Sequence, residues 1–131
     1  MSHFTAVETQ MNDLLCLIEA IKDLGYEYVH DEQGVNVRGY NQQMEKALIS
    51  VKVSGKYDVG IKQGVNGFEM VADWWGVEAT RGVTEQEFVN QIQQRYAFHK
   101  VVKEVKKKGY TLDMEEVKQG QTISLTVRKW Q

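Results

Sequence analysis

Apolar residues recur at helical spacing near the start of the chain. Five of them lie three or four positions apart along one stripe: Leu14, Leu17, Ile18, Ile21 and Leu24. Asn12 or Asp13 can cap the start of this segment, and Gly25 can take the left-handed conformation that ends a helix. The pattern predicts an amphipathic helix that ends before Gly25.

A second helix is predicted from the signals at its two ends. Glu87 follows Thr84 by three residues, and this pair matches a capping box. Val83 and Phe88 stand at the positions of a hydrophobic staple. An apolar stripe continues from Phe88, and three lysines followed by a glycine at 106–109 mark the far end. The signals together predict one long helix over residues 84–108.

The remaining segments alternate apolar and polar residues in short runs, as β-strands do. The predicted strands are residues 3–9, 26–29, 35–37, 47–53, 57–61, 68–75, 110–116 and 122–127. A turn at 31–34 is expected to separate the second strand from the third. Short glycine-containing turns join 47–53, 57–61 and 68–75, which predicts an antiparallel meander. The last two strands are predicted to form a hairpin around Gln119-Gly120.

These elements predict an α+β fold in two layers, with a mainly antiparallel sheet and two helices packed on one face. The chain has 131 residues, of which 42% are hydrophobic and 26% charged. This size and composition are typical of one globular domain. No segment has the composition of a linker or a low-complexity tract, so residues 1–131 are expected to form a single domain.

Charge and cysteine content narrow the possible roles and compartments. The formal charge is −2, and because phosphate contacts usually require a basic excess, nucleic acid is not the expected partner. The single cysteine, Cys16, excludes an intrachain disulfide and fits a reducing compartment. The first residues lack a secretory signal, and no apolar run reaches the ~18 residues that a membrane span needs. We expect a soluble, intracellular protein without a membrane span.

Several short motifs are spread over the whole chain. They are Ser2-His3-Phe4, Leu24-Gly25-Tyr26, Val37-Arg38-Gly39-Tyr40, Val71-Ala72-Asp73-Trp74-Trp75-Gly76, Gln94-Arg95-Tyr96-Ala97 and Val127-Arg128-Lys129-Trp130. The chain resembles in these motifs the hypothetical chloroplast reading frame thirty-five family of cyanobacteria and algal plastids, and the Ala-Asp-Trp-Trp-Gly stretch is the most specific. The resemblance implies a cyanobacterial cytoplasm or plastid stroma. It implies no activity and no catalytic residues, because the family is a domain of unknown function.

Two adjacent tryptophans make residues 73–76 the most informative segment. Successive side chains of a strand point to opposite faces, so Trp74 and Trp75 cannot both fill one core. One interpretation packs Trp74 below the helices and lets Trp75 cover the sheet edge. The other makes the outward tryptophan, with Asp73 beside it, a contact for a planar ligand or a partner protein.

Two arginines and a tyrosine are candidates for the same cluster. Arg38 and Tyr40 fall on one face of their predicted strand. A structural Arg38–Asp73 ion pair is expected, although the guanidinium could instead hold an external carboxylate or phosphate. Arg95, in the second predicted helix, could join them. The candidate binding residues are thus Arg38, Tyr40, Asp73, Trp74, Trp75 and Arg95.

Signatures of catalysis and of metal binding are missing from the sequence. His3, His30 and His99 do not have the spacing of metal ligands, and Cys16 has no second cysteine. His99 is expected to be a buried, hydrogen-bonded histidine, and Cys16 a buried thiol. We therefore assign no catalytic residue, no metal and no cofactor.

Three hypotheses of function remain. The leading one is a non-catalytic binding or adaptor protein, with a protein or small-molecule partner. The first alternative is a small enzyme that uses Asp73, Arg38 and Tyr40. The second is an RNA-binding sheet whose exposed aromatic side chains stack on bases. A homo-oligomer formed through an uncovered sheet edge also stays open.

Overall fold

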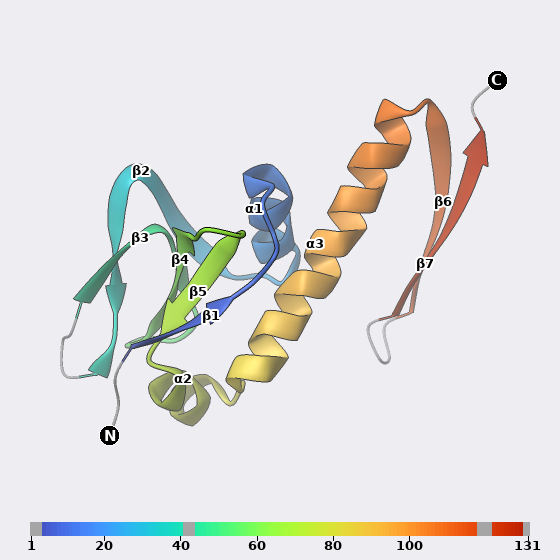
Figure 1. Ribbon diagram of the computed structural model, residues 1–131. Coiled ribbons are helices and arrows are strands. Elements are labelled where there is room, and N and C mark those ends of the chain that lie inside the picture. Colours follow the sequence, from blue (N-terminus) through green and yellow to red (C-terminus); the bar gives the residue numbers. More distant parts are fainter. Residues whose placement is uncertain (1–3, 41–43, 118–121, 130–131) are drawn as a thin grey trace.

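The computed structural model describes residues 4–40, 44–117 and 122–129 (Figure 1). Five strands form an antiparallel sheet in the order β1-β5-β4-β3-β2. They are β1 (Thr5–Glu8), β2 (Glu27–Arg38), β3 (Met44–Lys52), β4 (Asp58–Gln63) and β5 (Phe68–Ala72). The helices are α1 (Leu14–Asp23), α2 (Trp74–Arg81) and α3 (Glu85–Lys107). A separate hairpin consists of β6 (Tyr110–Val117) and β7 (Thr122–Lys129).

The α+β class and the antiparallel meander β3-β4-β5 are confirmed. Side chains of neighbouring strands meet in register, and Ile49, Ile61 and Met70 form a fully buried row. The helices cover this face of the sheet, with Leu17 from α1 and Phe88 from α3 buried in the same cluster. Burial of such side chains stabilises the fold by about 1.5–3 kcal/mol each. No described helix has the length and apolar character that crossing a membrane requires.

The helix ends follow the predicted capping chemistry. The Asp13 side chain accepts a hydrogen bond from the Cys16 amide at 3.1 Å, which caps α1. Thr84 and Glu87 form both bonds of the capping box at the start of α3, each at 3.1 Å. Gly25 follows α1 with φ +79°. The two predicted helices are therefore confirmed, and α3 runs uninterrupted for 23 residues.

The prediction of a turn between two short strands at 26–37 was wrong. Both halves belong to the single strand β2 and pair with β3, His30 with Ile49 and Val35 with Ala47. Residues 31–34 therefore face Leu48 alone and bulge out of the ladder. The residues that favour a turn form this bulge: Asp31 accepts from the Gln33 amide at 2.9 Å, and Gly34 has φ +111°. The chain bends there without reversing.

The bend carries the second half of β2 across β4. A Cβ atom on Gly60 would lie 2.5 Å from Val37 Cγ2, so this approach requires glycine on β4. Phe4, just before β1, packs against Gly39, just after β2: a Cβ atom on Gly39 would be 2.6 Å from Phe4 Cζ. The two edge strands of the sheet thus approach each other at one end. The sheet is strongly curled, and it holds a second group of buried side chains that includes Val37 and Val71.

A helix stands where the last two residues of a strand were predicted. The strand expected at 68–75 stops at Ala72, and α2 begins at Trp74. Asp73 causes the change, because its side chain accepts from the Gly76 amide as a helix N-cap. Gly82, with φ +79°, ends α2 and leads directly into α3. The molecule therefore has three helices among its described residues, one more than predicted.

The C-terminal hairpin is a two-stranded sheet of its own. Strands β6 and β7 pair over their whole length, which confirms the hairpin predicted from 110–116 and 122–127. Its predicted turn around Gln119-Gly120 lies outside the described residues. Figure 1 shows the hairpin on the far side of α3 from the five-stranded sheet, so α3 separates the two sheets.

Candidate functional site

Asp73 is the buried centre of the cluster predicted from sequence. Only 1% of this residue is exposed. Its Oδ1 accepts from the Gly76 amide and its Oδ2 from the Tyr40 amide, both at 3.2 Å. One carboxylate therefore holds the start of α2 and the chain just after β2 in a fixed relation. The predicted association of Asp73 with Tyr40 is present in the structure through the main chain of Tyr40.

The two tryptophans diverge from the first turn of α2. Trp74 is 7% exposed, its ring packs at 6.0 Å from that of Phe88, and its Nε1 donates to the Thr5 carbonyl at 3.1 Å. Trp75 is 66% exposed. The expectation that one is buried and one outward is met, but by helical geometry, since neighbouring helix residues point about 100° apart. Asp73 lies in the interior, not beside Trp75 on an outer face.

Tyr40, whose amide bonds to Asp73, and Trp75, two residues after Asp73, both have exposed side chains, and we call these two residues the aromatic corner. Tyr40 is 49% exposed. Buried Tyr57 supports the corner from below, and its ring occupies the space that a side chain at position 76 would need. Burial and the nearby charge of Asp73 raise the pKa of the Tyr57 hydroxyl. Gly76 therefore allows α2 to rest directly on Tyr57.

Arg38 does not pair with Asp73, so that prediction was wrong. Its guanidinium binds Asp58, with Nη2 at 2.8 Å from Oδ1 and Nε at 3.0 Å from Oδ2. Its Nη1 also donates to the Gly55 carbonyl at 2.8 Å. The bend in β2 explains the difference, because it brings Arg38 over the start of β4 and leaves Asp73 to the Tyr40 amide. These bonds give Arg38 a structural role next to the aromatic corner.

Sequence reasoning missed Asp58, which is completely buried. Lys52, its partner in the β3–β4 register, donates from Nζ at 3.1 Å and adds a second cation to that of Arg38. Burial alone would raise the pKa of Asp58, but the hydrogen bonds from Arg38 and Lys52 outweigh it and lower the pKa. A carboxylate directly across a short hairpin from a lysine is the signal that could have identified this pair.

Arg95 lies away from the aromatic corner, on the side of α3 that faces α1. Its Nη2 is 2.9 Å from Asp23 Oδ2, and His99 Nε2 lies 2.5 Å from the same oxygen. Burial acts to raise the pKa of Asp23, but His99 and Arg95 lower it overall. His99 is hydrogen-bonded as expected, although it is only half-buried. Cys16 is a buried free thiol, as predicted, and burial raises its pKa.

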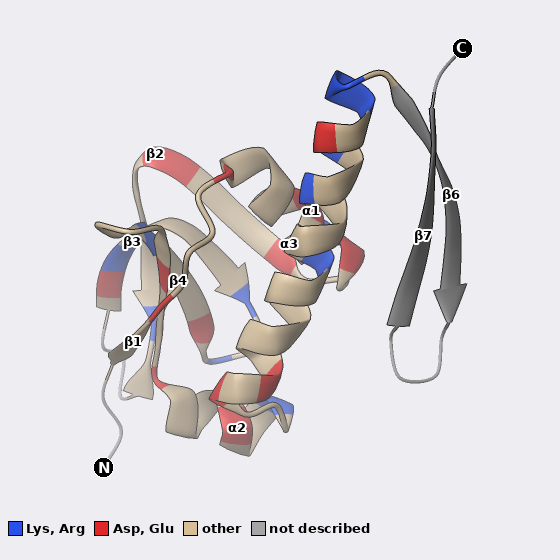
Figure 2. Ribbon diagram, turned by 45° about the vertical axis from the view of Figure 1, so that its right-hand side comes forward, with Lys and Arg blue, Asp and Glu red and all other residues tan. Residues whose placement is uncertain are grey.

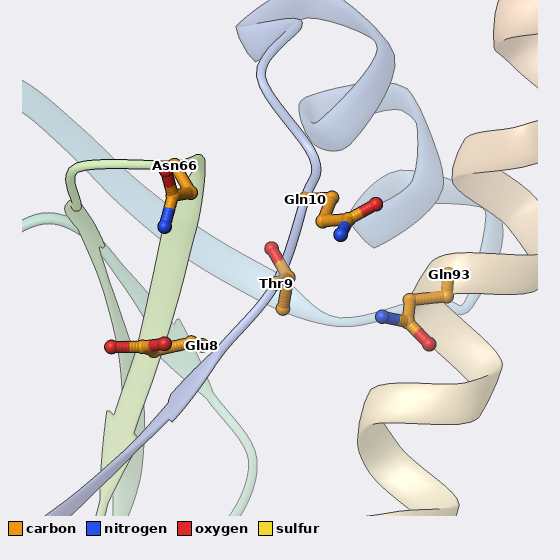
Figure 3. A pocket seen from close by; sticks show the side chains of 5 residues that line it. All are labelled: Glu8, Thr9, Gln10, Asn66 and Gln93. Atoms are coloured by element: carbon orange, nitrogen blue, oxygen red, sulfur yellow. The ribbon is translucent and has the colours of Figure 1, made fainter.

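A polar surface recess lies elsewhere, between β1, the β4–β5 turn and α3. It has a volume of about 370 Å³ and is lined by Glu8, Thr9, Gln10, Asn66 and Gln93. Figure 3 shows Glu8 and Asn66 on the β5 side of the chain, and Gln10 and Gln93 on the α3 side. Among the described residues, no three His, Cys, Asp or Glu side chains gather to hold a metal ion.

Known proteins resemble this chain over nearly its full length. A family model described as Protein of unknown function (DUF1257) matches residues 20–126. The protein named uncharacterized protein ycf35 of Guillardia theta is 32% identical, with 99% of this chain and 98% of the relative covered. Its namesake in Pyropia yezoensis is 29% identical, with the same coverage of both chains. The namesake in Cyanophora paradoxa is 26% identical, again over 99% and 98%.

The relatives confirm the resemblance seen in the sequence motifs, and they are plastid-encoded proteins of algae. No solved structure gives a significant match to the chain. The family match covers residues 20–126 and so includes Asp73, Trp75 and strands β2 to β5 of the curled sheet. The chain belongs to the DUF1257 family, whose function is unknown.

Proposed function

We propose that this protein is a non-catalytic binding module that contacts a partner protein through the aromatic corner of Tyr40 and Trp75. The main observation behind this proposal is that Trp75 is 66% exposed at a point where the buried Asp73 carboxylate holds the backbone. Trp and Tyr are enriched at the residues that dominate binding energy in protein interfaces. Large aromatic side chains bring contact area at a low cost in conformational entropy.

Preorganisation of the corner supports this proposal. Asp73 holds the Tyr40 and Gly76 amides, Trp74 is anchored to β1, and Tyr57 fills the space beneath Gly76. The chain around the exposed rings therefore needs little reordering when a partner binds, which lowers the cost of association. A surface that is rigid and aromatic suits a contact with a folded protein.

The other hypotheses draw less support from the same residues. The enzyme hypothesis relied on Asp73 with Arg38, but Asp73 is bonded to main-chain amides and Arg38 to Asp58. A small-molecule site would be concave, and the polar recess that the structure describes is built from Glu8, Thr9 and neighbouring amide side chains, without Tyr40 or Trp75. RNA binding needs cations beside the stacking rings. Arg38, beside the corner, is bonded to Asp58, and Arg81 of α2 lies over the Tyr26 ring. Lys106 and Lys107 lie in the last turn of α3, at the opposite end from α2 (Figure 2).

The proposed compartment follows from the relatives. The similar proteins are plastid-encoded, and a binding module of this family would act in the plastid stroma or in the cytoplasm of a cyanobacterium. A partner is therefore to be sought in that compartment, with the protein purified gently from its own host.

Native mass spectrometry of the purified protein tests the proposal. We expect a stoichiometric complex with a partner protein for the wild type and at least about a tenfold loss of it for Trp75→Ala, which is a typical effect at a binding hot spot. Val65→Ala is the matched control, because Val65 is 98% exposed in the β4–β5 turn. Both variants should unfold at the wild-type temperature, since neither side chain is buried.

Two outcomes would contradict the proposal. In the first, the complex persists in Trp75→Ala at the wild-type level. In the second, Val65→Ala and Trp75→Ala weaken it equally, which would indicate a loss of general surface hydrophobicity and not of a specific contact.

A further inference from the structure

Strand β1 presents an unpaired edge to solvent. It is the first strand in the order β1-β5-β4-β3-β2 and therefore pairs only with β5 within the described sheet. The Thr9 amide donates to the Phe68 carbonyl at 3.1 Å. In an antiparallel pair, every second residue directs its main-chain groups to the neighbouring strand, so Thr5, Val7 and Thr9 face β5. By that alternation, the main-chain N–H and C=O groups of Ala6 and Glu8 point away from β5. Both residues are exposed.

The polar recess described above lies beside this edge. Its lining combines Glu8 and Thr9 at the end of β1 with the amide side chains of Gln10, Asn66 and Gln93. Carboxamides can both donate to and accept from a peptide main chain. A volume of about 370 Å³ is sufficient for a long side chain next to the strand.

Charge selects the kind of segment that fits the edge. Glu8 and Glu69 are direct partners in the β1–β5 register, so their side chains lie on the same face of the sheet. Two like charges at this spacing are destabilising, and a cation between them would relieve the repulsion. Lys62, the neighbour of Glu69 on β4, forms its ion pair with Glu45 at 3.1 Å.

We propose that the β1 edge binds an extended, basic segment of a partner protein as a sixth strand. The segment's main chain would bond to Ala6 and Glu8, and an alternate Lys or Arg side chain would meet Glu8 and Glu69. Such strand addition gains affinity from main-chain bonds and specificity from alternate side chains. This surface is independent of the aromatic corner, so either proposal can fail without the other.

A peptide of alternating Thr and Lys, eight residues long, is the probe. It is titrated into the ¹⁵N-labelled full chain, with a Thr-Glu peptide of equal length for comparison. We expect the Thr-Lys peptide to shift the amide signals of Ala6 and Glu8 and the side-chain NH₂ signals of Gln10 and Gln93. The Thr-Glu peptide should bind at least about tenfold more weakly, and the difference should shrink as salt is added.

Two variants separate main-chain pairing from charge. Ala6→Pro removes an outward N–H without touching the β1–β5 ladder, as an edge strand tolerates, and should reduce Thr-Lys binding at least about tenfold. Glu8→Lys should reverse the preference between the two peptides. A dispersed spectrum with unchanged β5 signals verifies that each variant is folded, and Val65→Ala is the control that should bind as the wild type does.

Three results would overturn the proposal. Absence of shifts on β1 at millimolar Thr-Lys peptide would exclude strand addition of this kind. Equal affinity for both peptides, or undiminished binding by Ala6→Pro, would show that main-chain pairing and Glu8 do not recognise the segment. A dimer in light scattering that Ala6→Pro dissociates would replace the partner segment by a second copy of the chain.

Discussion

At the scale of single residues, a few buried polar groups decide how the surface is arranged. Asp73 ends a strand, caps a helix and holds the Tyr40 amide, all with one carboxylate. Asp58 holds the end of β2 in place, because it accepts hydrogen bonds from the main-chain amide and the guanidinium of Arg38. Charged residues that suggest a catalytic or binding role in the sequence thus have a structural role, which is to hold neighbouring segments in position.

Replacement of Asp73 tests this structural role. In Asp73→Ala, α2 loses its N-cap and the Tyr40 amide loses its acceptor. We expect the free energy of unfolding to fall by about 2–3 kcal/mol, measured by urea denaturation. Trp75→Ala is the control and should change it by less than about 0.5 kcal/mol. Wild-type stability in Asp73→Ala would return Asp73 to the list of candidate catalytic groups.

At the scale of elements, a cluster of polar and charged side chains binds the N-terminal end of α1 to α3. The Tyr96 hydroxyl accepts from the Asn12 and Asp13 amides at 3.1 and 3.0 Å. The Asp13 carboxylate caps α1 and also binds Lys103 of α3 at 2.5 Å. The hydrogen bond from Lys103 lowers the pKa of Asp13 to about 2, against the effect of burial. The contact between the two helices therefore depends on pH.

This dependence predicts a loss of stability in acid. Because the folded pKa of Asp13 is depressed, its contribution is complete above the unfolded value near 3.8 and is lost as pH falls toward 2. Water screens the half-exposed Lys103, so we expect this contribution to be small. Asp13→Asn keeps an equivalent cap and should lose less stability than the wild type between pH 5 and pH 2.5, in urea titrations at each pH. Parallel losses in both proteins would contradict the assignment.

The local sequence signals of each helix and strand explain which elements could be predicted from sequence. The two long helices carry complete capping signals, and the strands of the meander are separated by glycine turns, so local chemistry and tertiary structure agree there. At 31–34 the local signal for a turn was real, but pairing of both flanks with β3 converted it into a bulge. At Trp74 an alternating pattern continued past the strand end, and it concealed the local N-cap bond from the Gly76 amide to Asp73. The second partner of Asp73, the Tyr40 amide, is brought near only by the fold.

The candidate site could be predicted only in part, because some of its contacts depend on how the strands and helices pack. Asp73 bonds to the main chain of Tyr40, so these two predicted residues are brought together, whereas Asp73 is buried and does not lie beside Trp75 on an outer face. The Arg38–Asp58 pair depends on the bend of β2 across β4, which no periodicity reports. Arg95 belongs to a helix whose rotation relative to the sheet is set by packing against α1.

At the scale of the whole molecule, the curl of the sheet depends on the absence of a side chain at position 60. Gly60 faces Val37 Cγ2 and Ala47 Cβ, at 2.5 and 3.1 Å from the place of a Cβ atom. A Cβ atom at position 60 would clash most closely with Val37 of β2, and β2 carries Arg38 and leads to Tyr40. The shape of the sheet and the position of the aromatic corner are therefore coupled.

A pair of substitutions at this crossing should compensate each other. Gly60→Ala alone overpacks the contact and should cost about 2 kcal/mol, and Val37→Ala alone leaves a cavity of similar cost. In the double variant the new methyl group occupies the vacated space, so we expect a coupling energy of at least about 1 kcal/mol. Chemical denaturation of all four proteins measures it. Simple additivity of the two costs would mean that β2 does not rest on Gly60.

The pairing of β1 with β5 also determines the order in which the molecule can be completed during synthesis. Thr5 pairs with Ala72, and the Trp74 indole donates to the Thr5 carbonyl. Of the five strands of this sheet, β1 leaves the ribosome before the others and must therefore wait, without a partner, until α2 has begun to emerge. Closing a loop of that length is slow compared with forming the local hairpins β3–β4 and β4–β5. The exposed, polar Thr5 and Glu8 suit a segment that has to remain extended in water before it docks. Among the five strands of the sheet, the one made first is therefore the last to join.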